Sequence, residues 1–194
     1  MASPIRNPNK VKQILNVYQK RSKRDYMILF VGFYTALRVA DLVELKVKDV
    51  KGKRILKVKE KKTGKYREYE MPPSLVQALE KYCKGRDGEE YLFLSRQYAP
   101  KRLNKEGEYF EKGNTPVSRQ RVWQLMKDIE KEFGLEDISC HTLRKTFGYQ
   151  HYRMFKNLAT LMKILNHRSI EETKIYIGLV DEEVNHELRH FDYA

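Results

Sequence analysis

Apolar residues recur at helical spacing along most of the chain. Steps of three and four residues, which bring side chains to one face of a helix, occur in several separate segments. These segments are residues 8–18, 26–37, 35–45, 75–82, 118–133, 142–155, 158–165 and 184–191. Asn7 followed by Pro8 is typical of a helix start, and Gly134 is typical of a helix end. Residues 26–37 are apolar nearly all round, which predicts a buried helix at the centre of the core.

One part of the chain changes to the pattern of strands. Residues 55–59 and 66–71 are rich in β-branched and aromatic residues, and Lys-Lys-Thr-Gly-Lys lies between them. This arrangement predicts a β-hairpin with a lysine-rich tip. Residues 91–94 are expected to form a short buried strand, and residues 95–115 a long polar loop. The expected fold class is therefore mainly α with a small antiparallel β-hairpin, an α+β arrangement.

Length and charge restrict the kind of protein. A chain of 194 residues without a low-complexity linker predicts a single domain over residues 1–194. Lys and Arg number 39 against 26 Asp and Glu, so the net charge of +13 favours a polyanionic partner. Cys83 and Cys140 have no metal-ligand or redox spacing, and the apolar run 27–37 is too short to span a bilayer. We expect a cytoplasmic protein without a membrane segment.

The segment from Cys140 to Gly178 holds four residues that make chemical sense together. His141 and Arg144 lie three residues apart at the start of a predicted helix, where the N-terminus already favours anions. His167 precedes Tyr176 by nine residues. Taken separately, His141 could be a helix cap and Arg144 a surface charge. Taken together, the four residues predict a site for a phosphate.

Several motifs occur in a family-specific order. Thr-Ala-Leu-Arg-Val-Ala-Asp-Leu spans residues 35–42, Lys-Thr-Gly spans 62–64 and His-x-x-Arg spans 141–144. Leu-x-x-x-Leu-x-His spans 161–167 and is followed nine residues later by Tyr176. In order and spacing these elements resemble the catalytic domain of the tyrosine recombinase (phage integrase) family. The resemblance runs from about Asn7 to the C-terminus and implies the catalytic-domain fold of these DNA breaking and rejoining enzymes.

The resemblance implies site-specific DNA recombination by transesterification. Tyr176 would attack the scissile phosphate, leaving a 3′-phosphotyrosyl bond and a free 5′-hydroxyl that then attacks a partner strand. Arg38 and Arg144 would hold the nonbridging oxygens of the phosphate. Lys62 would protonate the leaving 5′-oxygen. Because the bond energy is conserved, neither ATP nor a metal nor another cofactor is implied.

The resemblance also implies catalytic roles for His141 and His167 and a supporting role for Asp41. His141 would assist proton transfer, His167 would orient the phosphate by hydrogen bonding, and Asp41 would support the cations without being catalytic. The expected partner is double-stranded DNA, on which the protein is expected to form a tetramer. The side chains expected to contact DNA are those of Lys61, Lys65, Arg119, Arg121, Lys145 and Arg168.

The chain departs from the family pattern in three places. Ala36 and Asn166 stand where the family usually has glycine; asparagine tolerates the left-handed backbone, whereas Ala36 indicates a junction that is not left-handed. These recombinases usually carry an N-terminal DNA-binding domain, and we expect that domain to be absent here. Residues 179–194 could dock on a neighbouring protomer in trans or pack in cis.

Other functions fit parts of the sequence. His186-Glu187-x-x-His190 matches the zinc-protease pattern, in which two histidines one turn apart bind the metal and the glutamate acts as a base. A third ligand normally follows, but only residues 191–194 remain, so we interpret this match as accidental. A type IB topoisomerase-like nicking-closing enzyme would use a similar set of residues. A DNA-binding regulator without activity is the third alternative.

Overall fold

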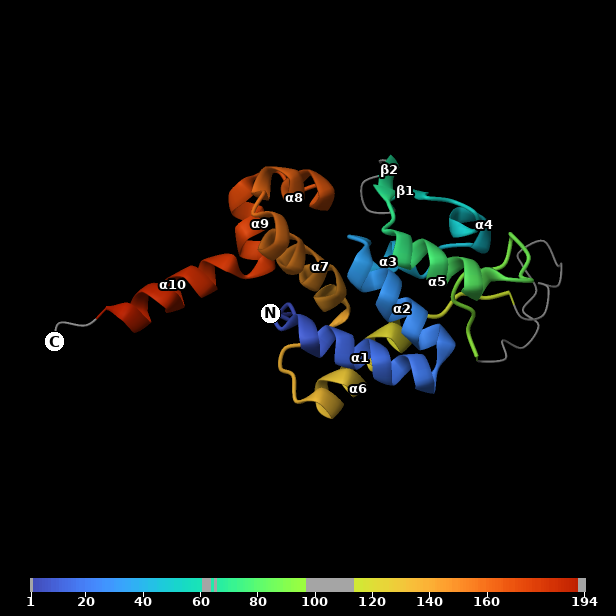
Figure 1. Ribbon diagram of the computed structural model, residues 1–194, viewed down its shortest axis with the longest axis horizontal. Coiled ribbons are helices and arrows are strands. Elements are labelled where there is room, and N and C mark those ends of the chain that lie inside the picture. Colours follow the sequence, from blue (N-terminus) through green and yellow to red (C-terminus); the bar gives the residue numbers. More distant parts are fainter. Residues whose placement is uncertain (1, 61–63, 65, 97–113, 192–194) are drawn as a thin grey trace, which may run out of the picture.

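The chain folds into a mainly helical body with one β-hairpin, which confirms the predicted fold class. The computed structural model describes residues 2–60, 64, 66–96 and 114–191. The helices are α1 (Pro8–Arg21), α2 (Lys23–Tyr34), α3 (Val39–Leu42), α4 (Val47–Val50), α5 (Pro73–Cys83), α6 (Arg119–Phe133), α7 (Cys140–Phe155), α8 (Leu158–Leu165), α9 (Ile170–Ile177) and α10 (Leu179–His190). Helices α7, α8 and α9 pack together on one side, and the hairpin lies with α4 and α5 on the other (Figure 1).

The hairpin forms where the β-branched and aromatic residues on either side of Lys-Lys-Thr-Gly-Lys predicted it. Strands β1 (Ile55–Lys59) and β2 (Tyr66–Glu70) pair antiparallel, with Val58 opposite Arg67. Every second side chain of β1 is buried. On β2, Arg67 and Tyr69 are the less exposed side chains. The hairpin therefore turns one guanidinium and one phenol of β2 toward the helices, while Lys61, Lys62 and Lys65 of the predicted tip lie outside the described residues.

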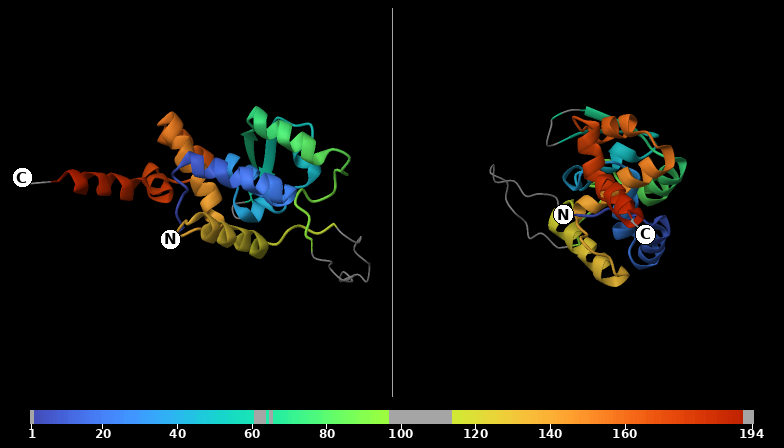
Figure 2. Two further views of the ribbon diagram at one scale, coloured as in Figure 1. Left: turned by 60° about the horizontal axis from the view of Figure 1, so that its bottom comes forward. Right: turned by 90° about the vertical axis from the view of Figure 1, so that its left-hand side faces the viewer.

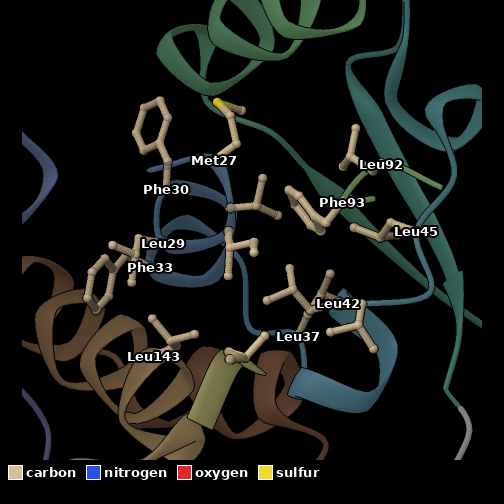
Figure 3. Packing of buried hydrophobic residues seen from close by; sticks show 14 of the residues in the cluster. Met27, Leu29, Phe30, Phe33, Leu37, Leu42, Leu45, Leu92, Phe93 and Leu143 are labelled. Atoms are coloured by element: carbon tan, nitrogen blue, oxygen red, sulfur yellow. The ribbon is translucent and has the colours of Figure 1, made fainter. Parts of the chain in front are cut away.

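Helix α2 is the centre of the core, as its nearly all-round apolar sequence predicts. Its residues from Met27 to Val31 are buried, together with residues from α5, α6 and α7. Figure 3 shows Leu143 of α7 lying next to Leu29 and Phe33 of α2. A smaller buried cluster lies under α8 and α9, and Tyr69 packs against both clusters. The hairpin and the C-terminal helices therefore meet at Tyr69.

The segment around Arg38 differs from the prediction. Helix α2 ends at Tyr34, and only Val39–Leu42 is helical in the segment 35–45 that was expected to continue a helical stripe. Thr35 has an extended backbone, and its hydroxyl donates to Val31 O over 2.8 Å, closing the end of α2. Arg38 is extended as well and precedes α3, so it does not share a helix face with Asp41.

The backbone at Asn166 and Ala36 bears on the two predictions made where the family usually has glycine. Asn166 has φ 53°, the conformation that asparagine tolerates. Ala36 does not have a positive φ, as expected for a non-glycine residue at that junction.

The strand expected at residues 91–94 is absent, and this prediction was wrong. Tyr91 and Leu94 form only isolated bridges, with Lys46 and Pro116 respectively. The short apolar run is buried between neighbouring segments and does not pair with another strand. Periodicity alone cannot distinguish these two environments. No helix in the described part of the chain is long and apolar enough to cross a membrane.

Gly148 sets how closely α7 approaches α9. A Cβ atom at this position would lie 2.9 Å from Ile177 Cγ2 and 3.4 Å from Leu165 Cδ1. We predict that Gly148→Ala lowers the free energy of unfolding in urea, because overpacking typically costs about 1–3 kcal/mol, offset in part by the roughly 1 kcal/mol that alanine gains in a helix. Gly88→Ala, whose Cβ would meet only Lys48 Cβ at 3.4 Å, is the control. Equal stability of the Gly148 variant and the wild type would contradict the close packing.

Candidate functional site

A buried carboxylate joins two arginines beside the hairpin. Glu60 follows β1 and is 1% exposed. Its Oε1 lies 2.9 Å from Arg67 Nη1, in a hydrogen bond, and 3.0 Å from Arg38 Nη1, in an ion pair without hydrogen-bond alignment. The pairing connects the segment before α3 to β2. Neither Glu60 nor Arg67 was identified from the sequence. Arg67 could have been, because side chains of a strand alternate between its two faces, and Arg67 lies on the same face of β2 as Tyr69.

The C-terminal turn of α8 accepts hydrogen bonds from two arginines. Arg67 donates to the carbonyls of Lys163, over 2.7 Å, and Ile164. Arg144 donates to the carbonyl of Leu165. The last carbonyls of a helix have no partner within the helix and carry its negative dipole end, so guanidinium donors stabilise them. Arg67 and Arg144 thereby hold the end of α8, directly before His167.

Arg144 is also tied to the segment that carries Arg38. It is 3% exposed, and its guanidinium donates to the carbonyl of Ala36 as well. Helix α7 begins with a cap in which Ser139 Oγ accepts from the backbone N–H of His141, which places Arg144 one turn further into the helix. Burial lowers the pKa of Arg144, and the charges of Arg38 and Arg67 act in the same direction.

Positive charge dominates this buried region. The hydroxyl of Tyr69 lies within electrostatic range of Arg38, Arg67, Arg144 and Glu60, and burial raises its pKa. Its oxygen is enclosed and has no hydrogen-bond partner in the described part of the chain. Three guanidiniums with one carboxylate leave a local positive excess, and a singly charged phosphodiester would reduce it.

Tyr176 lies on α9 beside this charge cluster. Its ring meets that of His167 edge-on, with centroids 4.9 Å apart, and Lys145 Nζ lies 5.2 Å from its centroid. Its hydroxyl oxygen is enclosed and has no hydrogen-bond partner among the described residues. Burial raises the pKa of Tyr176, while Arg144 and Arg38 act against that rise. Tyr176 is therefore a neutral phenol in the free chain.

His167 is held by α9. Its Nδ1 lies 3.1 Å from Thr173 Oγ1. Burial lowers the pKa of His167, the charges of Arg144 and Arg38 lower it further, and Glu172 raises it. The imidazole is therefore neutral at physiological pH.

The structure brings together four of the residues singled out from the sequence: Arg38, Arg144, His167 and Tyr176. His141 is exposed in the first turn of α7. Lys62, the predicted general acid, lies outside the described residues, as do Lys61 and Lys65. Asp41 is buried and lines a groove with Lys57 and Lys59 of β1. Its supporting role stays a prediction.

The other predicted DNA contacts differ in accessibility. Arg119 and Arg168 are exposed. Arg121 pairs with Asp25 over 3.2 Å. Lys145 is 5% exposed and covered by Tyr176, so the free chain does not present it on the surface as a contact residue would require.

The zinc-like motif lies on α10. His186 and His190 stack with ring centroids 4.4 Å apart, and His190 Nδ1 donates to His186 O over 2.8 Å. Both side chains are exposed. No group of three His, Cys, Asp or Glu side chains suited to a metal is found in the described ranges. The buried, three-ligand arrangement of zinc proteases is not formed by this pair with any described residue.

We predict that Arg67→Met destabilises the chain, because it leaves a buried carboxylate short of a partner and the end of α8 without a donor. Breaking a buried ion pair typically costs about 3–5 kcal/mol. The matched control is Lys57→Met on the same hairpin, which removes an exposed pair with Glu68 and should cost less than about 1 kcal/mol. Urea unfolding measures both, and equal losses would contradict a special role for Arg67.

The chain is similar to known proteins over most of its length. The model of the phage integrase family matches residues 6–183. The probable integrase/recombinase YoeC of Bacillus subtilis is 36% identical over 183 residues, which is 94% of this chain and 92% of YoeC. The tyrosine recombinase XerA of Pyrococcus furiosus is 29% identical over 168 residues, which is 86% of this chain and 54% of XerA. The chain thus spans nearly all of YoeC and about half of XerA.

Solved structures show the same fold. A crystal structure of XerA recombinase matches with a TM-score of 0.71 at 23% identity, covering 100% of this chain and 66% of that one. A lambda integrase dimer bound to a COC′ core site matches with a TM-score of 0.65 at 17% identity, covering 91% of this chain and 48% of that one. With the family model matching most of its length and the arginine, histidine and tyrosine motifs gathered at one place, this chain belongs to the phage integrase family and has the tyrosine recombinase catalytic domain.

Proposed function

We propose that this chain is a site-specific DNA recombinase that cuts and rejoins strands through a covalent bond between Tyr176 and a DNA 3′-phosphate. The observation that carries the proposal is the convergence of Arg38, Arg144, His167 and Tyr176 from separate segments around a positive centre. Catalysis of phosphoryl transfer depends mainly on positioning and on charges aimed at the transition state. The site supplies both.

The chemistry can be assigned to individual groups. Tyr176 Oη forms the new bond to phosphorus, and the bond from phosphorus to the 5′-oxygen breaks. Arg144 uses only part of its five N–H donors on Ala36 O and Leu165 O, so it retains donors for a nonbridging oxygen. Arg38, partly exposed, supplies the second guanidinium. The proton that the leaving 5′-oxygen needs comes from Lys62, and the proton that Tyr176 Oη loses is transferred with the help of His141.

In the free chain, Tyr176 is not yet activated for attack on a phosphate. The enclosed, neutral phenol of the free chain is a poor nucleophile. Hydrogen bonds of a catalytic site often tighten only when the substrate binds. Docking of DNA is therefore the step that we expect to align Tyr176 with the phosphate.

Double-stranded DNA is the proposed partner, and the cytoplasm the proposed location. The net charge of +13 and the exposed Arg119 and Arg168 support contact with the phosphate backbone. Lambda integrase, whose fold this chain shares, was solved as a dimer on a DNA core site. A nicking-closing enzyme of the topoisomerase IB type would share the cleavage step but would not join DNA from two partners.

Tyr176→Phe tests the covalent step. With nicked suicide substrates carrying candidate sites, the wild type should form a protein–DNA adduct that survives denaturation, and the variant should form none, because phenylalanine has no nucleophilic oxygen. Tyr34→Phe is the control, since this exposed phenol lies outside the site and should leave the yield unchanged. The proposal fails if Tyr176→Phe gives the wild-type yield, or if the wild type binds these substrates without forming an adduct.

We propose further that α10 docks on a neighbouring protomer in a DNA-bound tetramer. Figures 1 and 2 show α10 extending away from the rest of the chain. Leu188 of α10 and Phe191, directly after the helix, are apolar side chains that are 64% and 67% exposed. Exposed apolar groups on a projecting helix suit burial against another protein surface.

Loss of the α10 contact should reduce assembly on DNA without abolishing binding of one protomer. A chain truncated after Gly178 and the double variant Leu188→Asp/Phe191→Asp should both yield single-protomer complexes in native gels, where the wild type forms larger ones. Met154→Asp, which changes an apolar residue of α7 that is 75% exposed, is the matched control. Undiminished assembly of both variants would show that α10 does not dock on a neighbouring protomer.

A further inference from the structure

The segment before α1 is packed against α7. Ile5 is 2% exposed, and its N–H donates to Thr146 Oγ1 over 2.9 Å. Gln150 Nε2, one turn further along α7, donates to the carbonyls of Ile5, over 3.0 Å, and of Arg6, over 2.8 Å. The buried isoleucine anchors the segment further, because returning it to water is unfavourable. The backbone of Arg6 therefore has a fixed place on α7.

The side chain of Arg6 reaches from this place to the junction of α9 and α10. Its Nη2 donates to Gly178 O over 3.1 Å. Its guanidinium carbon lies 5.6 Å from the ring centroid of Tyr149, an α7 residue that is 1% exposed. A guanidinium close to an aromatic ring is attracted to it electrostatically, so Tyr149 supports Arg6 beside Gly178. Arg6 thus links α7 to the end of α9.

Gly178 is the hinge between the two helices. It ends α9 and begins α10, with φ 73° and ψ 27°, and its N–H donates to Ile175 O over 3.1 Å. Its carbonyl belongs to the planar peptide that leads into Leu179, the first residue of α10. A bond that fixes this carbonyl therefore fixes the first peptide of α10. A Cβ atom on Gly178 would lie 3.1 Å from Arg6 Nη2, so the guanidinium packs closely on the hinge.

The direction of α10 depends on this junction. Figures 1 and 2 show α10 extending away from the rest of the chain, and residues 185–191 are exposed. Because a helix of 12 residues is about 18 Å long, a rotation of about 30° at the hinge displaces its far end by roughly 9 Å. Glycine permits such rotations more readily than other residues do. Leu179, which is 8% exposed, also restrains the start of α10.

We infer that Arg6 is a positioning residue that fixes the direction in which α10 leaves α9. Its guanidinium bonds the hinge peptide, and its backbone is anchored on α7. The consequence for assembly rests on the proposed docking of α10 on a neighbouring protomer. A helix that is already oriented loses less conformational freedom on docking than one that swings. Arg6 therefore favours assembly on DNA.

The direction of α10 can be measured without DNA. Nitroxide labels on Gln13→Cys in α1 and Glu187→Cys in α10 report the distance between two exposed positions by double electron–electron resonance. Cys140→Ser removes a partly exposed native thiol, and the buried Cys83 is retained. The labelled chain should show one narrow distance distribution, because the hinge is held.

Three substitutions test the contact. Arg6→Met removes the donor to Gly178 and should broaden the distance distribution. Gln150→Met releases the backbone of Arg6 and should broaden it to a smaller extent. Arg153→Met is the matched control, because it removes a second guanidinium near Tyr149, 6.0 Å from the ring centroid, and keeps the donor to Gly178; it should leave the distribution unchanged. Both arginines are exposed, so neither substitution should prevent folding.

Assembly on DNA is the second readout. In native gels with duplexes carrying candidate sites, Arg6→Met should raise the protein concentration needed for half-maximal assembly about threefold to tenfold, the scale of losing one hydrogen bond. Binding of a single protomer should stay unchanged, and Arg153→Met should assemble like the wild type. A weaker single-protomer complex with normal assembly would show that Arg6 contacts DNA, and would overturn its role in assembly.

The two claims can fail separately. The inference is overturned if the labelled wild type gives a broad distribution, or if Arg6→Met leaves the distribution narrow, since other contacts of α10 would then hold the helix. If truncation after Gly178 does not reduce assembly, the proposed docking of α10 fails. The distance measurement still decides whether Arg6 fixes the direction of α10.

Discussion

The C-terminal turn of α8 is the structural feature on which the geometry of the site depends. Arg67 from the hairpin and Arg144 from α7 both donate to its last carbonyls. The chain then passes through the left-handed Asn166 to His167 and on to the helix that carries Tyr176. Because the dipole and the unpaired carbonyls of a helix end attract cations, these contacts suit guanidinium groups in particular. Three parts of the chain that are distant in sequence are joined at this point.

The same arrangement concentrates positive charge away from water. Arg144 is almost fully buried, and the buried carboxylate of Glu60 pairs with both Arg38 and Arg67. Burying charges without full pairing is unfavourable for stability, and a buried pair is seldom better than apolar packing. A site that binds a phosphodiester requires uncompensated positive charge before the substrate arrives. We interpret the imbalance as a functional feature that the surrounding core stabilises.

Some residues of the site could be predicted from the sequence and others could not, for physical reasons. Arg144, His167 and Tyr176 could be identified because fixed spacing on neighbouring helices and the order of the motifs point to them. Glu60 could not, because a carboxylate within a lysine-rich segment is ordinarily a solvated surface group. Lys145 was expected at the DNA surface, but α9 covers it. Whether a lysine on an amphipathic helix is exposed depends on what packs against it.

The local sequence determined the start of α1, the end of α6, the hairpin and the residue types of the chemistry, since capping, turn preference and periodicity act between near neighbours. It also determined the left-handed turn at Asn166, because few residues other than glycine tolerate that conformation. Only the tertiary structure decided that Arg38 would lie in an extended segment, that Glu60 would bind two guanidiniums and that the end of α8 would bind two arginines. These contacts join residues far apart in the chain, and their formation depends on burial and packing that no local pattern specifies.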